Sequence, residues 1–149
     1  MVVAAGNDGA ATILDTDDQE VPNPSHNIWN VPGAAEWSMT VGSMTPDRTM
    51  SEFSTQASYV DVTGPRSGVL STAFDQDGAT WEQMSGTSDG DSHVAGLAAV
   101  LRGAFPGDSA AQIVERVTAS AASFGTGDVQ DASDGCPVGT RSRGASAPA

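Results

Sequence analysis

The sequence predicts an α/β fold, with three layers built around a mostly parallel sheet. Short apolar segments, typical of strands buried on both faces, occur at 2–5, 38–42 and 59–62. Segments with helical character follow them, an Ala- and Leu-rich one over 88–105 and another that starts at Ser109. Strands that alternate with helices along a chain favour helices packed against a parallel sheet.

The first strand lies directly after Met1, which is unusual for a strand of the central sheet. A parallel strand that is buried in this way needs neighbours on both sides. We therefore expect Met1 to be internal to a longer reading frame and the chain to hold only the C-terminal half of the fold. We also expect weak stability, because missing neighbours expose apolar surface and an unpaired sheet edge.

Residues 8–27 are polar, with four acidic residues clustered over 15–20 and two prolines close behind, and predict a loop. Carboxylates such as Asp15 and Asp17 could bind a hard cation such as calcium. The spacing lacks the glycine and distal glutamate of an EF-hand loop, so we favour a solvated acidic loop. His26 is interpreted as a surface residue of this loop rather than a base.

An Asp-Gly pair at 77–78 separates two β-prone segments, 70–74 and 79–84, and predicts a β-hairpin. A metal-binding role for Asp75 and Asp77 is the weaker interpretation. Small and apolar residues are almost continuous over 88–105, so this helix should be buried on most sides.

Ser109 and Gln112 have the spacing of a capping box at the start of the second helix, whose apolar face carries Ile113, Val114 and Val117. We assign residues 1–132 to one domain. Residues 133–149, rich in Gly, Ser, Ala and Pro, are predicted to be a disordered tail.

The composition limits the partners. The net charge is −13 and the sequence contains no lysine, which argues against nucleic acids and anionic membranes because both are negatively charged. Cys136 is the single cysteine, so an internal disulfide is impossible. No segment has the apolar length of a membrane span, and nothing in the sequence indicates the oligomeric state.

Ser88 lies where a small, turn-forming run, 85–88, enters the helix. Unpaired backbone N–H groups and the helix dipole favour negative charge at such a position. A nucleophilic serine benefits from this arrangement, because the oxyanion that forms on attack needs donors already in place. The alternative is that Ser88 serves only as the N-cap of the helix.

Three motifs, in this order along the chain, resemble those of the subtilisin-like serine proteases, or subtilases. Residues 2–7, V-V-A-A-G-N, resemble the strand that ends in the oxyanion-hole asparagine of the family. Residues 60–72 resemble its V-D-V-x-A-P-G…I-x-S-T run. Residues 86–96, G-T-S-D-G-D-S-H-V-A-G, resemble the nucleophile motif G-T-S-M-A-[ST]-P-H-V-A-G.

The resemblance implies a serine endopeptidase of subtilisin-like fold that acts on peptides or proteins through an acyl-enzyme. Ser88 would be the nucleophile, Asn7 an oxyanion-hole donor, and Ala4, Ala5 and Gly6 one wall of the primary specificity pocket. It also implies a secreted parent protein and a cis bond between residues 31 and 32. The resemblance makes no cofactor certain and allows for bound calcium. It implies no catalytic metal.

A base for the serine is missing from the sequence. His93 follows Ser88 by five residues, which places it about 140° around a helix, and His26 lies in no motif. The triad order of the family is Asp, His, Ser, so both partners should precede Asn7. The corresponding D-[ST]-G and H-G-T motifs do not occur in the sequence, and we expect the chain alone to be inactive.

Residues 89–92 depart from the family motif at four adjacent positions, with Asp89 in place of Met and Asp91 in place of Ser or Thr. A negative charge at about 6 Å, with an effective dielectric near 20, would oppose the oxyanion by roughly 3 kcal/mol. The alternative function is therefore a non-catalytic subtilase-like module that binds peptides or partner proteins.

Overall fold

The computed structural model describes residues 1–10, 12–17, 19–24, 31–65 and 69–122. His26, Cys136 and the tail predicted at 133–149 lie outside these ranges. The elements in chain order are β1 (Val2–Ala4), β2 (Thr12–Leu14), β3 (Glu20–Pro22), β4 (Met39–Met44), β5 (Val62–Pro65), β6 (Val69–Asp75), β7 (Gly78–Met84), α1 (Thr87–Ala104) and α2 (Ala110–Ser120).

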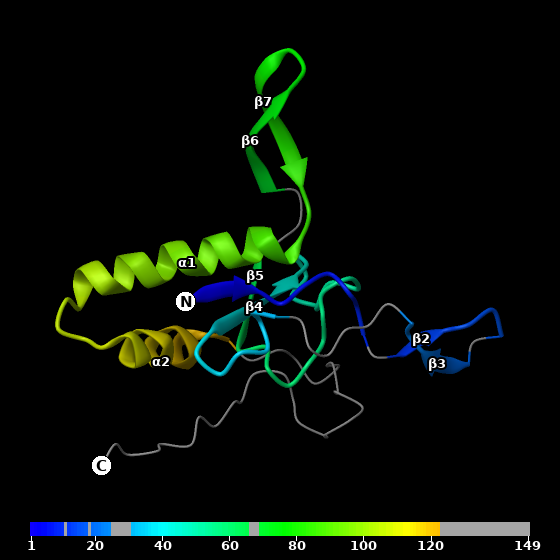
Figure 1. Cartoon of the computed structure of the whole chain (residues 1–149), viewed down its shortest axis with the longest axis horizontal. Coiled ribbons are helices and arrows are strands. Elements are labelled where there is room, and N and C mark those ends of the chain that lie inside the picture. The colour runs from blue at the N-terminus through cyan, green and yellow to red at the C-terminus, as the bar shows by residue number, and fades with distance from the viewer. Residues whose placement is uncertain (11, 18, 25–30, 66–68, 123–149) are drawn as a thin grey trace.

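A three-stranded parallel sheet forms the centre of the fold, which confirms the predicted α/β class (Figure 1). Its order is β1-β4-β5, with Val3 opposite Thr40 in one pair and Gly42 opposite Thr63 in the other. Parallel neighbours require long connections. Consequently residues distant in sequence, the C-terminal ends of β1, β4 and β5, lie at the same edge of the sheet.

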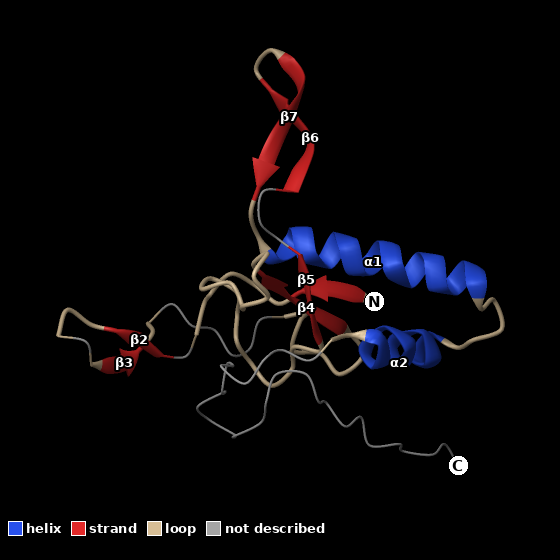
Figure 2. Ribbon diagram, turned by 180° about the vertical axis from the view of Figure 1, so that it is seen from behind, coloured by secondary structure: helices blue, strands red, loops and turns tan. Residues whose placement is uncertain are grey.

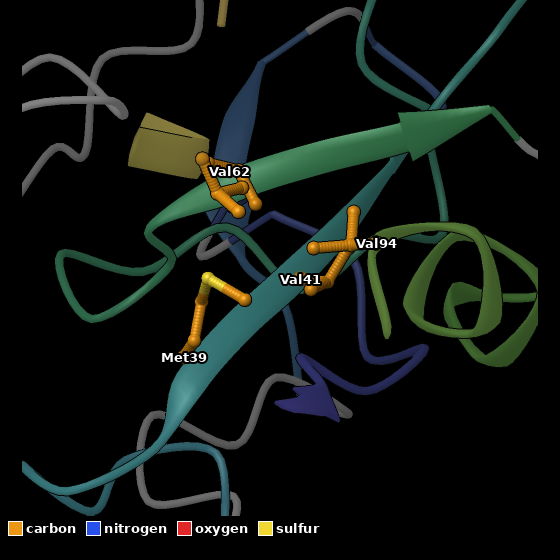
Figure 3. Packing of buried hydrophobic residues seen from close by; sticks show 5 residues of the cluster. Met39, Val41, Val62 and Val94 are labelled. Atoms are coloured by element: carbon orange, nitrogen blue, oxygen red, sulfur yellow. The ribbon is translucent and has the colours of Figure 1, made fainter. Parts of the chain in front are cut away.

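Helix α1 packs on one face of this sheet. Met39 and Val41 of β4 alternate toward that face and meet Val62 of β5 and Val94 of α1 in the main apolar cluster (Figure 3). Side chains of α2, Val117 and the partly buried Val114, join the same cluster. Both helices therefore contribute to one core, as the apolar pattern of the second helix predicted.

The N-terminal turn of α1 approaches the sheet closely at two glycines. A Cβ added to Gly64 would lie 2.4 Å from the carbonyl oxygen of Gly90, and one added to Gly90 would lie 2.9 Å from that of Gly42. Contacts this short leave no space for a side chain. The absence of Cβ atoms at Gly64 and Gly90 thus sets how deeply the start of α1 sits over β4 and β5.

The predicted strand at 59–62 is wrong for its first three residues, since β5 begins only at Val62. The backbone N–H of Val60 donates instead to the carbonyl of Ala57, which closes a turn. Asp61 is 5% exposed, and its Oδ2 accepts the buried N–H of Thr40 at 2.8 Å. The backbone N–H of Asp61 also donates to the Thr40 carbonyl at 2.9 Å, so a side-chain and a backbone bond together tie the start of β5 to β4.

Helix α2 begins as its capping box predicts. The backbone N–H of Gln112 donates to the Ser109 hydroxyl at 3.3 Å, and the Ser109 N–H donates to Gln112 Oε1 at 2.7 Å. These bonds satisfy two donors that the first turn of a helix leaves unpaired.

Helix α1 spans the predicted range, but the expectation that it is buried on most sides is wrong. Only Thr87, Gly90 and Val94 are buried, and Val100 is 70% exposed. The composition of the helix predicts burial all round, whereas the structure covers one side only (Figures 1 and 2).

The predicted hairpin at 70–84 is confirmed as β6–β7, which projects away from the sheet and helices (Figure 1). Its turn is closed by the Asp77 N–H, which donates to Asp75 Oδ1 at 2.8 Å, and by Gly78 at a φ of +115°. Leu70, Phe74 and Trp81 are all largely exposed on it.

The loop predicted at 8–27 contains a second, short hairpin, β2–β3, which the sequence did not indicate. Asp15 Oδ1 accepts the backbone N–H groups of Asp17 and Gln19, at 2.9 and 3.0 Å, and so shapes its turn. Within the described ranges, no three acidic, His or Cys side chains gather closely enough to hold a metal ion. Calcium binding stays a prediction.

The bond between Val31 and Pro32 is cis, as the family resemblance implied. Neither α1 nor α2 has the length and apolar character needed to cross a membrane.

Replacing Asp61 by alanine should lower the free energy of unfolding by about 1–3 kcal/mol, because the buried Thr40 N–H would lose its acceptor. Asp61→Asn keeps a side-chain oxygen and is the matched control, with a smaller loss. Urea denaturation followed by circular dichroism measures both. Equal stability of Asp61→Ala and wild type would show that the Asp61–Thr40 bond does not hold β5 to β4.

Candidate active site

Asn7 and the start of α1, 80 residues apart, are joined by two hydrogen bonds. Asn7 Oδ1 accepts the backbone N–H of Thr87 at 3.1 Å and the Thr87 hydroxyl at 3.0 Å. Thr87 is 1% exposed, so this link is held in place by packing. The end of β1 and the nucleophile motif, predicted to act together, are therefore in contact.

These bonds also orient the amide of Asn7. A backbone N–H can only donate, so the atom that faces it must be the amide oxygen. The Nδ2 group of Asn7 is then turned away from Thr87 and keeps its two N–H donors for another acceptor.

Three polar atoms surround one point above Gly86. The position that a Cβ on Gly86 would occupy lies 3.1 Å from Ser88 Oγ, 3.7 Å from Asn7 Nδ2 and 3.8 Å from Asp89 Oδ2. The φ of Gly86 is −173°, an extended value that any residue can adopt. Glycine at position 86 thus lets these three groups come close to the backbone, and the backbone conformation itself does not require glycine.

Ser88 is the second residue of α1 and is exposed, whereas the N-cap is Gly86. The alternative that Ser88 is only an N-cap is therefore wrong, and the N-cap glycine itself has no side chain to make a capping bond. Its hydroxyl lies at the helix end where N–H groups lack intrahelical partners. This geometry suits a group that develops negative charge nearby.

The three predicted pocket residues differ in their surroundings. Ala5 is completely buried against Ala57, Tyr59 and Val60, and its N–H donates to the Val41 carbonyl at 2.8 Å. Ala4 and Gly6 keep partial exposure, and Gly6 has a φ of +105°. Any pocket wall here is formed by Ala4, Gly6 and backbone rather than by the Ala5 side chain, and the wall itself stays a prediction.

Two carboxylates accompany Ser88 in the first turns of α1. Asp89 Oδ2 and Asp91 Oδ1 are inaccessible to solvent, and no described residue donates a hydrogen bond to either atom. Burial raises the pKa of the Asp91 carboxyl above its ordinary value. Burial of the Asp91 carboxylate without a hydrogen-bond donor therefore carries an electrostatic cost in the fold.

His93 does not approach Ser88. It is exposed, and its Nδ1 lies 2.7 Å from the backbone carbonyl oxygen of Asp89, one turn back along α1. The described residues therefore bring Ser88 and Asn7, the predicted nucleophile and oxyanion donor, together, with no described imidazole beside them.

The family model described as "Subtilase family" matches residues 1–140. The chain belongs to the subtilase family. The subtilisin-like serine protease AsES of Sarocladium strictum is 37% identical over 81% of this chain and 29% of its own length. The cuticle-degrading serine protease of Arthrobotrys oligospora is 36% identical over 83% of this chain and 26% of its own length.

Among solved structures, MycP1 from Mycobacterium smegmatis superposes with a TM-score of 0.60 and 28% identity. The match covers 85% of this chain and 36% of that chain. This chain thus spans about a third of a solved subtilase relative. The predicted subtilisin-like fold and family are confirmed, and the activity of the 149-residue chain is a separate question.

Sequence reasoning missed the roles of Gly86 and Thr87, although both lie in the nucleophile motif. The hydroxyl of Thr87 could have been expected to bind a partner, but the partner is 80 residues away. The approach of Asn7, Ser88 and Asp89 to Gly86 joins side chains from two segments that are distant in the sequence. Neither contact leaves a periodic signal in the sequence.

Asp91→Asn should raise the melting temperature at pH 7. A carboxyl whose pKa is raised in the folded state favours folding when it is protonated. This contribution to stability is fully present at pH values below the ordinary pKa of 3.8, and it is lost as the pH rises through the folded-state pKa. The difference between variant and wild type should therefore shrink toward pH 3. Thermal unfolding across pH 3–7, with Asp77→Asn of the exposed turn as control, tests this; a constant difference contradicts it.

Proposed function

We propose that this chain supplies the nucleophile and oxyanion half of a subtilase serine endopeptidase. The observation that carries the proposal is the convergence of Ser88 Oγ and Asn7 Nδ2 within 4 Å of one point above Gly86. Membership of the subtilase family supports it.

In the proposed reaction, Ser88 Oγ attacks the carbonyl carbon of the scissile peptide bond and loses its proton to a general base. The resulting oxyanion accepts hydrogen bonds from Asn7 Nδ2 and the backbone N–H of Ser88. Removing one such donor typically costs about 100- to 1,000-fold in rate. The intermediate collapses to an acyl-enzyme as the base protonates the departing amine, and water then hydrolyses the ester.

The base and its acidic partner belong, in this proposal, to the part of the catalytic domain that this chain does not contain. His93 is directed elsewhere, as its contact with the Asp89 carbonyl indicates. The isolated chain is accordingly proposed to be inactive.

The second candidate function is a subtilase-like module that binds peptides without cleaving them. The observation that favours it is the Asp89 carboxylate, whose Oδ2 lies near the same point as Ser88 Oγ and has no described donor. A negative charge there opposes the oxyanion. At about 6 Å and an effective dielectric near 20, the opposition is roughly 3 kcal/mol before screening.

The proposed substrates are peptides or proteins. A net charge of −13 disfavours nucleic acids and anionic membranes as partners. We further propose that the parent protein is secreted. The name of one relative, a cuticle-degrading serine protease, is consistent with action outside the cell.

The test replaces the matched segment of MycP1 by residues 1–140 of this chain and measures labelling by a fluorophosphonate together with peptide hydrolysis. Ser88→Ala should abolish both. Asp89→Asn, which keeps the shape and removes the charge, should raise kcat by up to about 100-fold.

Asp108→Asn removes a charge of the same sign far along the chain and should leave kcat unchanged. A folded chimera that binds peptide but is not labelled, even with Asp89→Asn, would overturn the endopeptidase proposal in favour of the binding module.

A further inference from the structure

Asp89 carries the only carboxylate among the three polar groups that approach Gly86, and the proposed reaction does not use it. Its Oδ2 lies 3.8 Å from the position of a Cβ on Gly86, close to Ser88 Oγ at 3.1 Å and Asn7 Nδ2 at 3.7 Å. The same Oδ2 is inaccessible to solvent and accepts no hydrogen bond from a described residue. A shielded carboxylate is costly unless a donor or a cation pairs with it.

The position of Asp89 in the first turn of α1 explains an acidic residue there, but not the burial of its Oδ2. Negative charge near a helix N-terminus is stabilising even when the side chain is exposed to water. The Asp89 carboxylate is instead directed to the space beside Ser88. Asp89 as a whole keeps partial exposure, so a group that enters this space from solution can reach the carboxylate.

The described part of the chain provides no cation for Asp89. The whole sequence contains six arginines and no lysine, and Arg48, Arg102 and Arg116 are those within the described ranges. Arg116 forms an ion pair with Asp108, whose backbone carbonyl accepts a hydrogen bond from Arg102. Arg48 lies in the turn after β4. None of these described arginines is paired with the Asp89 carboxylate.

We propose that the substrate supplies the missing cation, so that Asp89 selects peptides with arginine or lysine next to the scissile bond. This inference rests on the proposed function, because it places the scissile carbonyl between Ser88 Oγ and Asn7 Nδ2. The residues that flank a peptide bond have Cα atoms bonded directly to its carbonyl carbon or its amide nitrogen, so both side chains start beside the reacting atoms. Arginine is the better partner, because its planar guanidinium matches a carboxylate.

A basic side chain at this place removes two penalties. It pairs with a carboxylate that otherwise lacks a partner, and it offsets the negative charge that opposes the oxyanion. A neutral peptide does neither, so the two substrates differ most in the transition state. The net charge of −13 adds a long-range attraction for cationic peptides. Asp89 then determines which substrates react, in addition to slowing the reaction of neutral ones.

The first experiment measures peptide binding to the full 149-residue chain at pH 7 by fluorescence anisotropy. The two labelled peptides differ only by arginine or citrulline at one position, and citrulline keeps the shape of arginine without its charge. Wild type should bind the arginine peptide about tenfold more tightly, because a charge-assisted hydrogen bond is lost with citrulline. Asp89→Asn should bind both peptides equally.

Asp91→Asn is the matched control, since it removes a like charge two residues further along α1 and should keep the preference for arginine. The circular dichroism spectra of Asp89→Asn and Asp91→Asn should match that of wild type, because no described residue donates a hydrogen bond to Asp89 Oδ2 or Asp91 Oδ1.

The second experiment uses the MycP1 chimera and peptides that contain a single arginine, with the products identified by mass spectrometry. Cleavage directly after or directly before the arginine shows which flanking residue pairs with Asp89. Asp89→Asn should raise kcat for the citrulline peptide but lower kcat/KM for the arginine peptide. A purely structural role of Asp89 would change both substrates in the same direction.

The proposal is overturned if wild type binds the two peptides equally or binds neither, if Asp89→Asn keeps the preference, or if Asp91→Asn abolishes it to the same extent. A preference for arginine in binding, together with a folded chimera that cleaves no peptide, counts against the endopeptidase. The selection of basic peptides by Asp89 would then belong to the binding module.

Discussion

The arrangement around Ser88 depends on the pair of hydrogen bonds from Thr87 to Asn7 Oδ1. These bonds connect the end of β1 to the first turn of α1, and they determine which way the Asn7 amide faces. Two neighbouring features reinforce the link, since Thr87 is buried and the start of α1 sits against Gly64 without an intervening side chain. The position of the Asn7 amide, the proposed oxyanion donor, therefore follows from packing at the start of α1.

The same helix end presents an electrostatic conflict. The N-terminus of α1 favours negative charge, which benefits both an oxyanion and the acidic residues of the first turn. Asp89 therefore stabilises the helix while it opposes the charge that Ser88 would create on a substrate. Because Asp89 Oδ2 is shielded from solvent, screening by water weakens this opposition less than it would at the surface. Stability of the helix and rate of the proposed reaction are therefore set against each other at Asp89.

The exposed apolar surface of α1 explains why its composition wrongly predicted a helix that is buried on most sides. Its residues are those of a helix surrounded by other elements, but the described structure covers only the side that carries Gly90 and Val94. The hairpin β6–β7 shows the same mismatch, with Phe74 and Trp81 largely exposed. In both elements the apolar residues exceed those that the described structure covers. The match to MycP1 takes in 36% of that chain.

The sequence by itself determined the elements whose signals are local. The capping box at Ser109, the Asp-Gly turn before β7 and the apolar strands β1 and β4 each depend on neighbouring residues, and the motif around Ser88 identified the family. Only the tertiary structure decided the long-range contacts. These are the hydrogen bond between Asp61 and Thr40 at the start of β5, the hydrogen bonds between Asn7 and Thr87, and the approach of three polar side chains to Gly86. Such contacts join residues that are 21 and 80 positions apart, and no periodicity encodes them. Their geometry is fixed by how the helix packs on the sheet, a property of the folded chain as a whole.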